Sequence, residues 1–174
     1  MIPRISTTPS TGLILGIDPG KNGGWALLDA QGRLGEAGHY PLDDDGEIDA
    51  AELHTILDEN GPISHAFVER VGSMGQSKDG RRQGVKGMFN FGRRYGAVLA
   101  VLQIAGIPYT LVEPSAWKRA TGVTSVKGTS LAAARKLWPS AADLLRRVKD
   151  EARAEAALIA RYGMLTTYSH RRAP

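Results

Sequence analysis

Three acidic residues stand in apolar surroundings at distant points of the chain. Asp18 ends the apolar run 13–17, Glu69 lies near the end of the run 65–71, and Glu155 is flanked by alanines. A buried carboxylate is unfavourable unless it has a partner, such as hydrogen-bond donors, a basic residue or a metal ion. Carboxylates that converge repel one another, and a divalent cation removes this conflict. In a chain without cysteine, such oxygen ligands favour Mg²⁺ or Mn²⁺.

Two such ions about 4 Å apart activate a water molecule and stabilise the leaving oxygen of a phosphodiester. If the three acids meet, they therefore predict hydrolysis of a nucleic-acid backbone. Each acid alone has a simpler explanation. Asp18 precedes Pro-Gly and suits a turn. Glu69 could form a surface ion pair with Arg70, and Glu155 could be ordinary charge on a helix face. Only the combination, in this order along alternating strands and helices, favours a catalytic site.

Short apolar runs between turn residues predict five strands, at 12–18, 24–29, 34–40, 65–71 and 107–112. Short turns join the first three, so we expect these strands to be antiparallel neighbours. The fourth strand follows a helix and can pair in parallel with the first. The sequence thus predicts an α/β fold with a mixed five-stranded sheet flanked by helices.

Apolar periodicity and composition predict helices at 48–59, 88–105, 114–122, 129–137 and 150–163. The helix at 88–105 is the most apolar, and we expect it to pack on the sheet. Gly163 is expected to end the last helix. The segment 72–87 is rich in glycine and basic residues and predicts a mobile surface loop.

A chain of 174 residues suits one domain with a sizeable core. No apolar run approaches about 18 residues, so we expect no membrane-spanning helix. The absence of cysteine excludes disulfides and is compatible with a reducing compartment. The net charge is +4, with acids concentrated in 43–59 and bases in later clusters. This pattern suits a polyanionic partner, although a solvated surface with a modest excess of bases explains it equally well.

Five short motifs, taken in order, resemble the RuvC-type Holliday junction resolvases, most closely the phage-type and related bacterial branch. The motifs are Leu-Gly-Ile-Asp18-Pro-Gly, Val-Glu69, Phe91-Gly-Arg-Arg-Tyr-Gly96, Pro114-Ser-Ala-Trp-Lys118 and Arg-Ala-Glu155-Ala-Ala-Leu-Ile-Ala. No single motif is specific, so the likeness rests on their number and order. It covers about residues 13–162, which is most of the chain.

The resemblance implies a ribonuclease H-like fold, and we expect a single nuclease domain over residues 12–163 with flexible tails at 1–11 and 164–174. It implies a homodimer that cuts four-way DNA junctions by paired, symmetric, metal-dependent nicks. It also implies a cytoplasmic protein of bacterial or phage origin. A branch-migration motor is left open as a further partner.

Carried over residue by residue, the resemblance makes Asp18, Glu69 and Glu155 ligands of Mg²⁺ or Mn²⁺, with two ions expected per site. Lys118 would lie near the scissile phosphate as an electrostatic aid. Lys127 is a weaker candidate for the same role, because plain phosphate contact or solubility explains it equally well.

The fourth acid departs from the family pattern. RuvC proteins generally place it three residues before the last acid, and that position here is Ala152. The phage-type branch tends to have an acid or histidine one or two places earlier, which leaves Asp150 and Glu151. Glu151 shares a helix face with Glu155, whereas Asp150 looks more like the usual aspartate of the branch. Both candidates stay open.

We expect the loop 72–87 and the start of the helix at 88 to face the junction. Phe89 could insert between bases, as apolar side chains do at distorted DNA, although aromatic residues at helical spacing more often belong to the core. The residues expected to contact DNA are Lys78, Arg81, Arg82, Lys86, Phe89, Arg93, Lys118 and Lys127.

Rival functions are another ribonuclease H-like nuclease, acting on RNA–DNA hybrids or on branched DNA generally, and a protein that binds junctions without cutting them. The missing acid at Ala152 makes the second rival conceivable. An actin-like phosphotransferase is more distant, because the chain is too short for the paired domains of that class.

Overall fold

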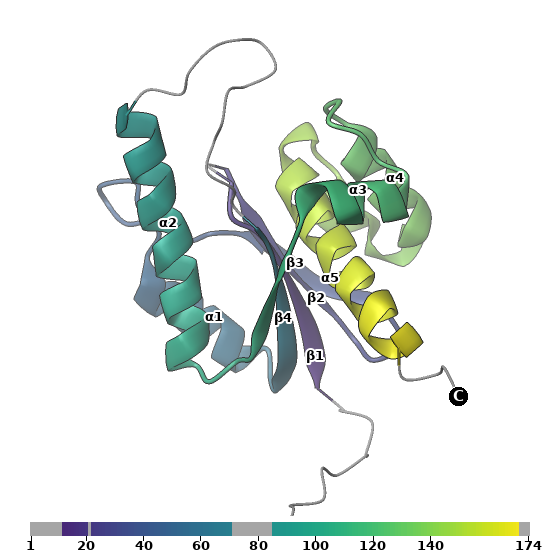
Figure 1. The fold of residues 1–174 in the computed structure, drawn as a ribbon, viewed down its shortest axis with the longest axis horizontal. Coiled ribbons are helices and arrows are strands. Elements are labelled where there is room, and N and C mark those ends of the chain that lie inside the picture. Colours follow the sequence, from purple (N-terminus) through teal and green to yellow (C-terminus); the bar gives the residue numbers. More distant parts are fainter. Residues whose placement is uncertain (1–11, 21, 71–84, 171–174) are drawn as a thin grey trace, which may run out of the picture.

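A five-stranded mixed sheet of order β3-β2-β1-β4-β5 forms the centre of the molecule (Figure 1). The structure is a computed structural model that describes residues 12–20, 22–70 and 85–170, with side chains over 87–167 in the last range. The strands are β1 (Leu13–Asp18), β2 (Gly24–Leu28), β3 (Leu34–His39), β4 (Ile63–Glu69) and β5 (Tyr109–Val112). The N-terminal tail and most of the predicted loop 72–87 lie outside the described residues.

The strand pairing confirms the predicted topology. β1 is antiparallel to β2, with Asp18 opposite Gly24, and β2 is antiparallel to β3. β1 and β4 are parallel, and so are β4 and β5. Because Ile17 pairs with Val68 in the parallel ladder, Asp18 and Glu69 end adjacent strands at the same edge of the sheet.

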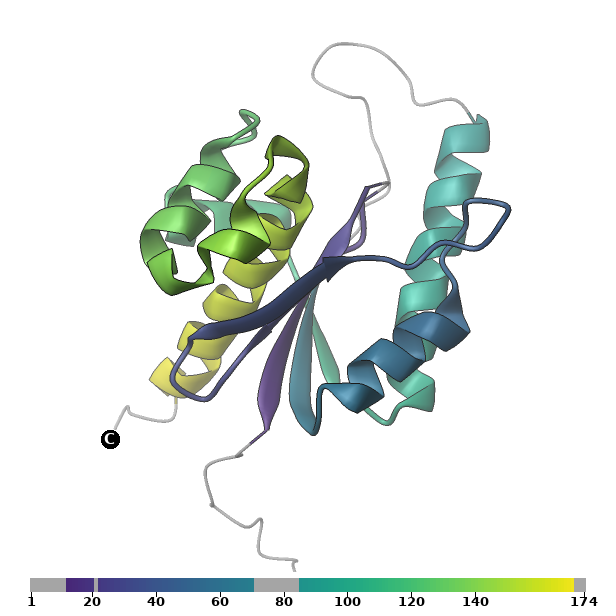
Figure 2. The same ribbon diagram turned by 180° about the vertical axis from the view of Figure 1, so that it is seen from behind.

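Helices cover both faces of the sheet (Figures 1 and 2). One face is covered by α1 (Ala50–Glu59) and α2 (Val85–Ile104), and the other by α3 (Pro114–Thr121), α4 (Thr129–Leu137) and α5 (Glu151–His170). The buried residues form two hydrophobic clusters, one on each face of the sheet. Alternate residues of β1 belong to the two clusters, with Leu15 and Ile17 on the α1 side and Ile14 on the α5 side. In the described ranges, none of these helices is long and apolar enough to span a membrane.

Helix α5 lies unusually close to β1 because small residues line the contact. A Cβ atom on Gly16 would collide with the main-chain oxygen of Ala156. The α5 residues 156–160 are fully buried against the sheet. The alanines around Glu155 therefore bring its helix directly onto the strand that carries Asp18.

Two details of the helices differ from the sequence-based expectation. The predicted end of the last helix at Gly163 is wrong, because α5 continues to His170 and residues 164–170 are helical rather than tail. Gly163 instead accommodates the ring of Phe67 on β4, with which a Cβ atom would collide. The sequence also does not predict the short 3₁₀ helices η1 (Pro139–Leu145) and η2 (Val148–Asp150), nor the start of α2 at Val85.

Candidate active site

Asp18 is held at the end of β1 by one hydrogen bond to its side chain and one to its main chain. Its Oδ1 accepts a hydrogen bond of 3.0 Å from the Gly20 amide, which is the turn contact expected for Asp-Pro-Gly. The Tyr40 hydroxyl donates a hydrogen bond of 2.8 Å to the main-chain oxygen of Asp18. Asp18 therefore does form the turn contact that its sequence suggests. Its side chain also contacts Glu155.

The carboxyl groups of Asp18 and Glu155 share a hydrogen bond. Burial, followed by the negative charge of Glu155 and to a smaller extent that of Glu69, raises the pKa of Asp18 from 3.8 to about 7, against the opposing effect of the Gly20 amide. Burial also raises the pKa of Glu155. Two carboxyl groups in hydrogen-bond contact retain one proton between them, because both cannot ionise at close range. The end of β1 and the middle of α5 thus meet at an acid pair.

Glu69 joins this pair from β4, and its carboxylate has a buried donor. The Trp117 Nε1 group donates a hydrogen bond of 2.6 Å to Glu69 Oε2. Burial raises the pKa of Glu69, the Trp117 hydrogen bond and the positive charge of Lys118 oppose this shift, and the charge of Glu155 adds to it. The three acids predicted from the sequence therefore interact electrostatically in one place.

Glu155 has two further neighbours that favour its charged form. The hydroxyl of Ser130 donates a hydrogen bond of 3.3 Å to Glu155 Oε1. The positive charge of Lys118 lowers its pKa, whereas the negative charge of Glu151 raises it. Glu151 is thus close enough to belong to the electrostatic environment of the acid pair.

Glu151 also caps the start of α4. Its carboxylate accepts hydrogen bonds from the amides of Gly128, at 3.0 Å, and Ser130, at 3.2 Å. Gly128 is the N-cap of α4 and offers no side-chain cap of its own. A carboxylate from another helix supplies the negative charge that a helix N-terminus favours.

Asp150 has a different set of partners. It is fully buried, and its Oδ1 lies 3.0 Å from the guanidinium of Arg147, 3.6 Å from that of Arg153 and 3.8 Å from Nε2 of His39. Burial alone would raise the pKa of Asp150, but the hydrogen bonds from Arg147 and the charge of Arg153 hold it below its usual value. These contacts anchor η2 and the start of α5 to the sheet beside β3.

The donor set of the acid pair and its neighbours suits a hard divalent cation. Asp18, Glu69 and Glu155 offer oxygen atoms only, and burial followed by repulsion between neighbouring acids raises the pKa of each of them. As the side chains stand, no three acidic, histidine or cysteine residues among those described form a group that could hold a metal ion. A cation would therefore have to displace the shared proton and draw the carboxylates together.

The described basic residues that were predicted to contact DNA differ in their exposure and in their neighbours. Lys118 is half-buried in α3, and its Nζ lies 5.2 Å from the centre of the Trp117 ring. Lys127 is exposed in the loop before α4. Arg93 in α2 pairs with Glu47 at 3.6 Å, and its guanidinium lies 5.9 Å from the ring centre of Phe89. Phe89 is 65% exposed, so it does not belong to the core.

Four of the predicted DNA-binding residues fall where the structure gives no side-chain position. Lys78, Arg81 and Arg82 lie outside the described residues, and Lys86 is described only as part of the backbone of α2. Their expected contacts with DNA stay predictions.

Sequence reasoning missed the polar residues that support the acids, namely Trp117, Ser130 and Tyr40. Trp117 stands within the motif that ends at Lys118. Its position next to this candidate residue is the one feature of the sequence that could have indicated a place near the site. Ser130 and Tyr40 carry no such indication, because their contacts with the site depend on how α4 and the end of β3 pack.

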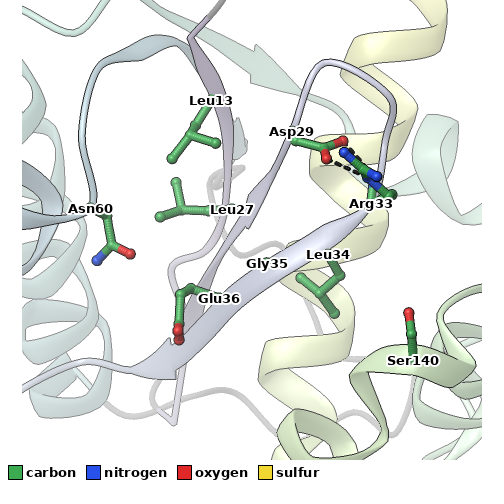
Figure 3. Close-up of a pocket in the computed structure, with 9 residues that line it drawn as sticks. All are labelled: Leu13, Leu27, Asp29, Arg33, Leu34, Gly35, Glu36, Asn60 and Ser140. Atoms are coloured by element: carbon green, nitrogen blue, oxygen red, sulfur yellow. Dashed lines mark hydrogen bonds and ion pairs between the residues drawn. The ribbon is translucent and has the colours of Figure 1, made fainter.

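A cavity of about 330 Å³ lies elsewhere on the sheet, around the β2–β3 turn (Figure 3). Leu13, the first residue of β1, lines it, whereas Asp18 is the last residue of that strand. Asp29 and Arg33 form an ion pair of 2.6 Å at its rim (Figure 3). The cavity is therefore separate from the acid site.

The strand order, the helices on both faces and the acids at neighbouring strand ends define a ribonuclease H-like α/β fold. Among solved structures, the chain is similar to Thermus thermophilus RuvC in complex with Holliday junction substrate. That likeness has 18% identity and a TM-score of 0.60, and it covers 90% of this chain and 96% of the other.

A second similar structure is Thermus thermophilus RuvC, with 18% identity, a TM-score of 0.59 and coverage of 89% of this chain and 96% of that one. No family model and no curated protein matches the sequence. The structural likeness confirms the predicted RuvC-type fold. At this level of identity, the fold is what the likeness establishes.

Proposed function

We propose that the protein is a metal-dependent endonuclease that resolves four-way DNA junctions by paired, symmetric nicks. The observation that carries the proposal is that Asp18 and Glu69 end adjacent parallel strands while the close packing of α5 on Gly16 brings Glu155 to the same place, where the three acids act on one another electrostatically. The fold adds support, because one similar structure is RuvC in complex with Holliday junction substrate.

Asp18, Glu69 and Glu155 are the proposed ligands of two Mg²⁺ or Mn²⁺ ions. When bound, the ions would activate a water molecule and stabilise the leaving oxygen of the phosphodiester. The proton between Asp18 and Glu155 would leave on binding, because carboxylate ligands bind in their deprotonated form.

We favour Glu151 over Asp150 as the fourth ligand. Glu151 acts on Glu155 electrostatically, and its present donors are two main-chain amides that water or DNA phosphate oxygens could satisfy instead. Asp150 is buried between Arg147 and Arg153, and moving it would leave these cations without their partner.

Lys118 is the proposed electrostatic aid to the reaction. Its charge already acts on Glu69 and Glu155, so its ammonium group would also act on a phosphate bound at these acids. A cation aimed at the charge that develops in the transition state lowers the barrier without reorganisation.

The proposed DNA surface extends from the acids to the start of α2. Lys127 would contact backbone phosphates, and Phe89 is exposed next to Arg93, an arrangement suited to stacking on a base beside a phosphate. The remaining contacts would come from Lys78, Arg81, Arg82 and Lys86.

A homodimer would place two acid sites on the two strands to be nicked. The exposed face of α2 is the proposed interface, because it carries Ile104, which is 78% exposed, and Gly92 and Gly96, where an added Cβ atom would meet nothing within 4 Å among the described residues outside the helix's own backbone. Small residues at such positions allow a second helix to approach closely.

The experiment is a substrate panel with labelled four-way junction, duplex, forked DNA and an RNA–DNA hybrid, each incubated in Mg²⁺ and in EDTA. We expect paired nicks in the junction alone, dependent on Mg²⁺ and absent in Asp18→Asn. Cleavage of the hybrid or of all branched DNA would favour the broader nuclease. Tight junction binding without any nick would identify a binding protein and overturn the proposal.

A further inference from the structure

Trp117 makes a short polar contact with one of the three acids. Its ring is fully buried in the core between α3 and α5, yet its Nε1 donates a hydrogen bond of 2.6 Å to Glu69 Oε2. An indole N–H can donate but cannot accept, and it carries no charge. The contact therefore occupies one carboxylate oxygen of Glu69 without offering a competing ligand to a cation.

The same ring lies under Lys118. The Lys118 Nζ is 5.2 Å from the centre of the ring, within the range of a cation–π contact. The rigid indole thus touches both a carboxylate and a cation of the site. These two contacts come from one side chain on an eight-residue helix.

The helix α3 holds the indole in place. It begins at Pro114 and ends at Gly122, whose left-handed φ of 71° suits a helix C-cap. The hydroxyl of Thr121 donates a hydrogen bond of 2.8 Å to the main-chain oxygen of Trp117. Burial of the ring and the fixed ends of the helix restrict the movement of the N–H group.

We infer that Trp117 is a positioning residue of the metal site, which orients the Glu69 carboxylate through its N–H and Lys118 through its ring. This inference rests on the proposed function. Fixing one oxygen of Glu69 leaves the other for the cation, and it limits the rotation of a side chain that otherwise could turn away. Partners of metal ligands act in this way in many sites, and their loss typically lowers metal affinity by about 10- to 100-fold.

The molecule offers a matched control in Trp138. Its ring is also buried, and its Nε1 donates a hydrogen bond of 2.8 Å, but to the main-chain oxygen of Gly32. Trp138→Phe therefore removes a buried indole hydrogen bond of similar length from the same core without touching an acid. A purely structural effect would appear equally in both variants.

The first measurement is Mn²⁺ affinity by calorimetry on full-length protein. We expect Trp117→Phe to bind Mn²⁺ about tenfold more weakly than the wild type and Trp138→Phe to stay within about twofold. The nicking rate of Trp117→Phe should recover partly at raised Mg²⁺. Equal affinities in the two variants would overturn the inference.

The second measurement is an NMR titration of the wild type, in which the variants are used only to assign resonances and need not be active. Indole N–H resonances of ¹⁵N-labelled wild type are assigned from the Trp→Phe variants and followed during Mg²⁺ titration. The Trp117 resonance should shift as Glu69 takes up the ion, and the Trp138 resonance should not. If the wild type binds Mg²⁺ and nicks junctions while the Trp117 resonance stays still, the inference fails and the proposed function stands. If the wild type neither binds the ion nor nicks, both fail.

Discussion

Asp18 and Glu155 are joined by a hydrogen bond between their carboxyl groups, although one ends the first strand and the other lies in the last helix. The contact exists because Gly16 lets α5 approach β1. A core contact between glycine and alanine thus determines the distance between two acids. The fold places excess negative charge at one point, and the proposed cation would relieve it.

The acid pair predicts that stability falls as pH rises. The pKa of Asp18 is raised from 3.8 to about 7 by burial and by Glu155, so between these values the folded state binds a proton that the unfolded state has lost. The stabilisation is complete below pH 3.8 and is lost as pH approaches 7. Asp18→Asn should therefore be more stable than wild type at pH 8 by roughly 2 kcal/mol.

Urea unfolding at pH 5 and pH 8 without divalent ions measures this difference. The stability gained in Asp18→Asn should shrink at pH 5. Addition of Mg²⁺ at pH 8 should stabilise the wild type and leave Asp18→Asn nearly unchanged. A constant difference at both pH values would show that Asp18 does not hold a proton in the native protein.

The two candidates for the fourth acid should separate when each is replaced by its amide. Asp150→Asn removes the buried carboxylate that pairs with Arg147 and with Arg153, whose side chain is 18% exposed, and should lower the free energy of unfolding by about 2–4 kcal/mol. Because the pKa of Asp150 is lowered, this contribution is present above its unfolded value of 3.8 and disappears as pH falls below it. Mn²⁺ affinity of the folded protein should stay close to wild type.

Glu151→Gln should give the opposite result. Its amide oxygen can still accept from Gly128 or Ser130, so stability should change by less than about 1 kcal/mol. Mn²⁺ affinity should fall clearly, because one anionic ligand is removed. Calorimetric titration of the two variants with Mn²⁺ decides between them, and weaker binding by Asp150→Asn alone would reverse the assignment.

The sequence was sufficient to predict the five strands, the neighbours of the first four and the three acids that interact. Alternating or continuous apolar runs mark strands, and short turns leave few ways to pair them. The position of Asp18 and Glu69 at one edge of the sheet follows from that pairing alone. The approach of Glu155 follows from the alanines beside it, since small residues permit a close helix.

Other features depend on packing between distant residues, which one sequence does not display. Gly163 resembles a helix stop by composition, but its function is to make room for Phe67, 96 positions earlier in the printed chain. The choice between Asp150 and Glu151 depends on where η2 ends and α5 begins. The hydrogen bond from Trp117 to Glu69 depends on the side-chain conformations of two separate elements.

Lys118 should matter for the reaction more than for the fold. Lys118→Met should lower the single-turnover nicking rate by about 10²–10³-fold, the usual cost of removing one electrostatic contact to a transition state. Lys118→Arg should keep part of the rate because it keeps the charge. Lys127→Met is the control. Loss of an exposed phosphate contact should reduce the salt dependence of junction binding by about one ion and should change the nicking rate little.

The proposed dimer can be tested at Gly96 in α2. Among the described residues outside the backbone of α2, none comes within 4 Å of a Cβ placed there, so Gly96→Gln should fold normally and gain about 0.5–1 kcal/mol from improved helix propensity. If a second α2 packs on this face, the larger side chain should shift the molar mass from dimer to monomer in light scattering. A variant that remains as dimeric as the wild type would locate the interface elsewhere.

The close approach of α5 to the sheet makes a final prediction at Gly16. A methyl group there would collide with the main chain of Ala156, so Gly16→Ala should lower the free energy of unfolding by about 3 kcal/mol. Gly35→Ala in β3 is the control, because the nearest atom to its Cβ is 4.0 Å away and the change should be neutral or slightly stabilising. If Gly16→Ala still folds, α5 must move outward and the Asp18–Glu155 contact must lengthen. Its stability should then depend less on pH than that of the wild type, and an unchanged dependence would show that the two acids are not joined through this helix contact.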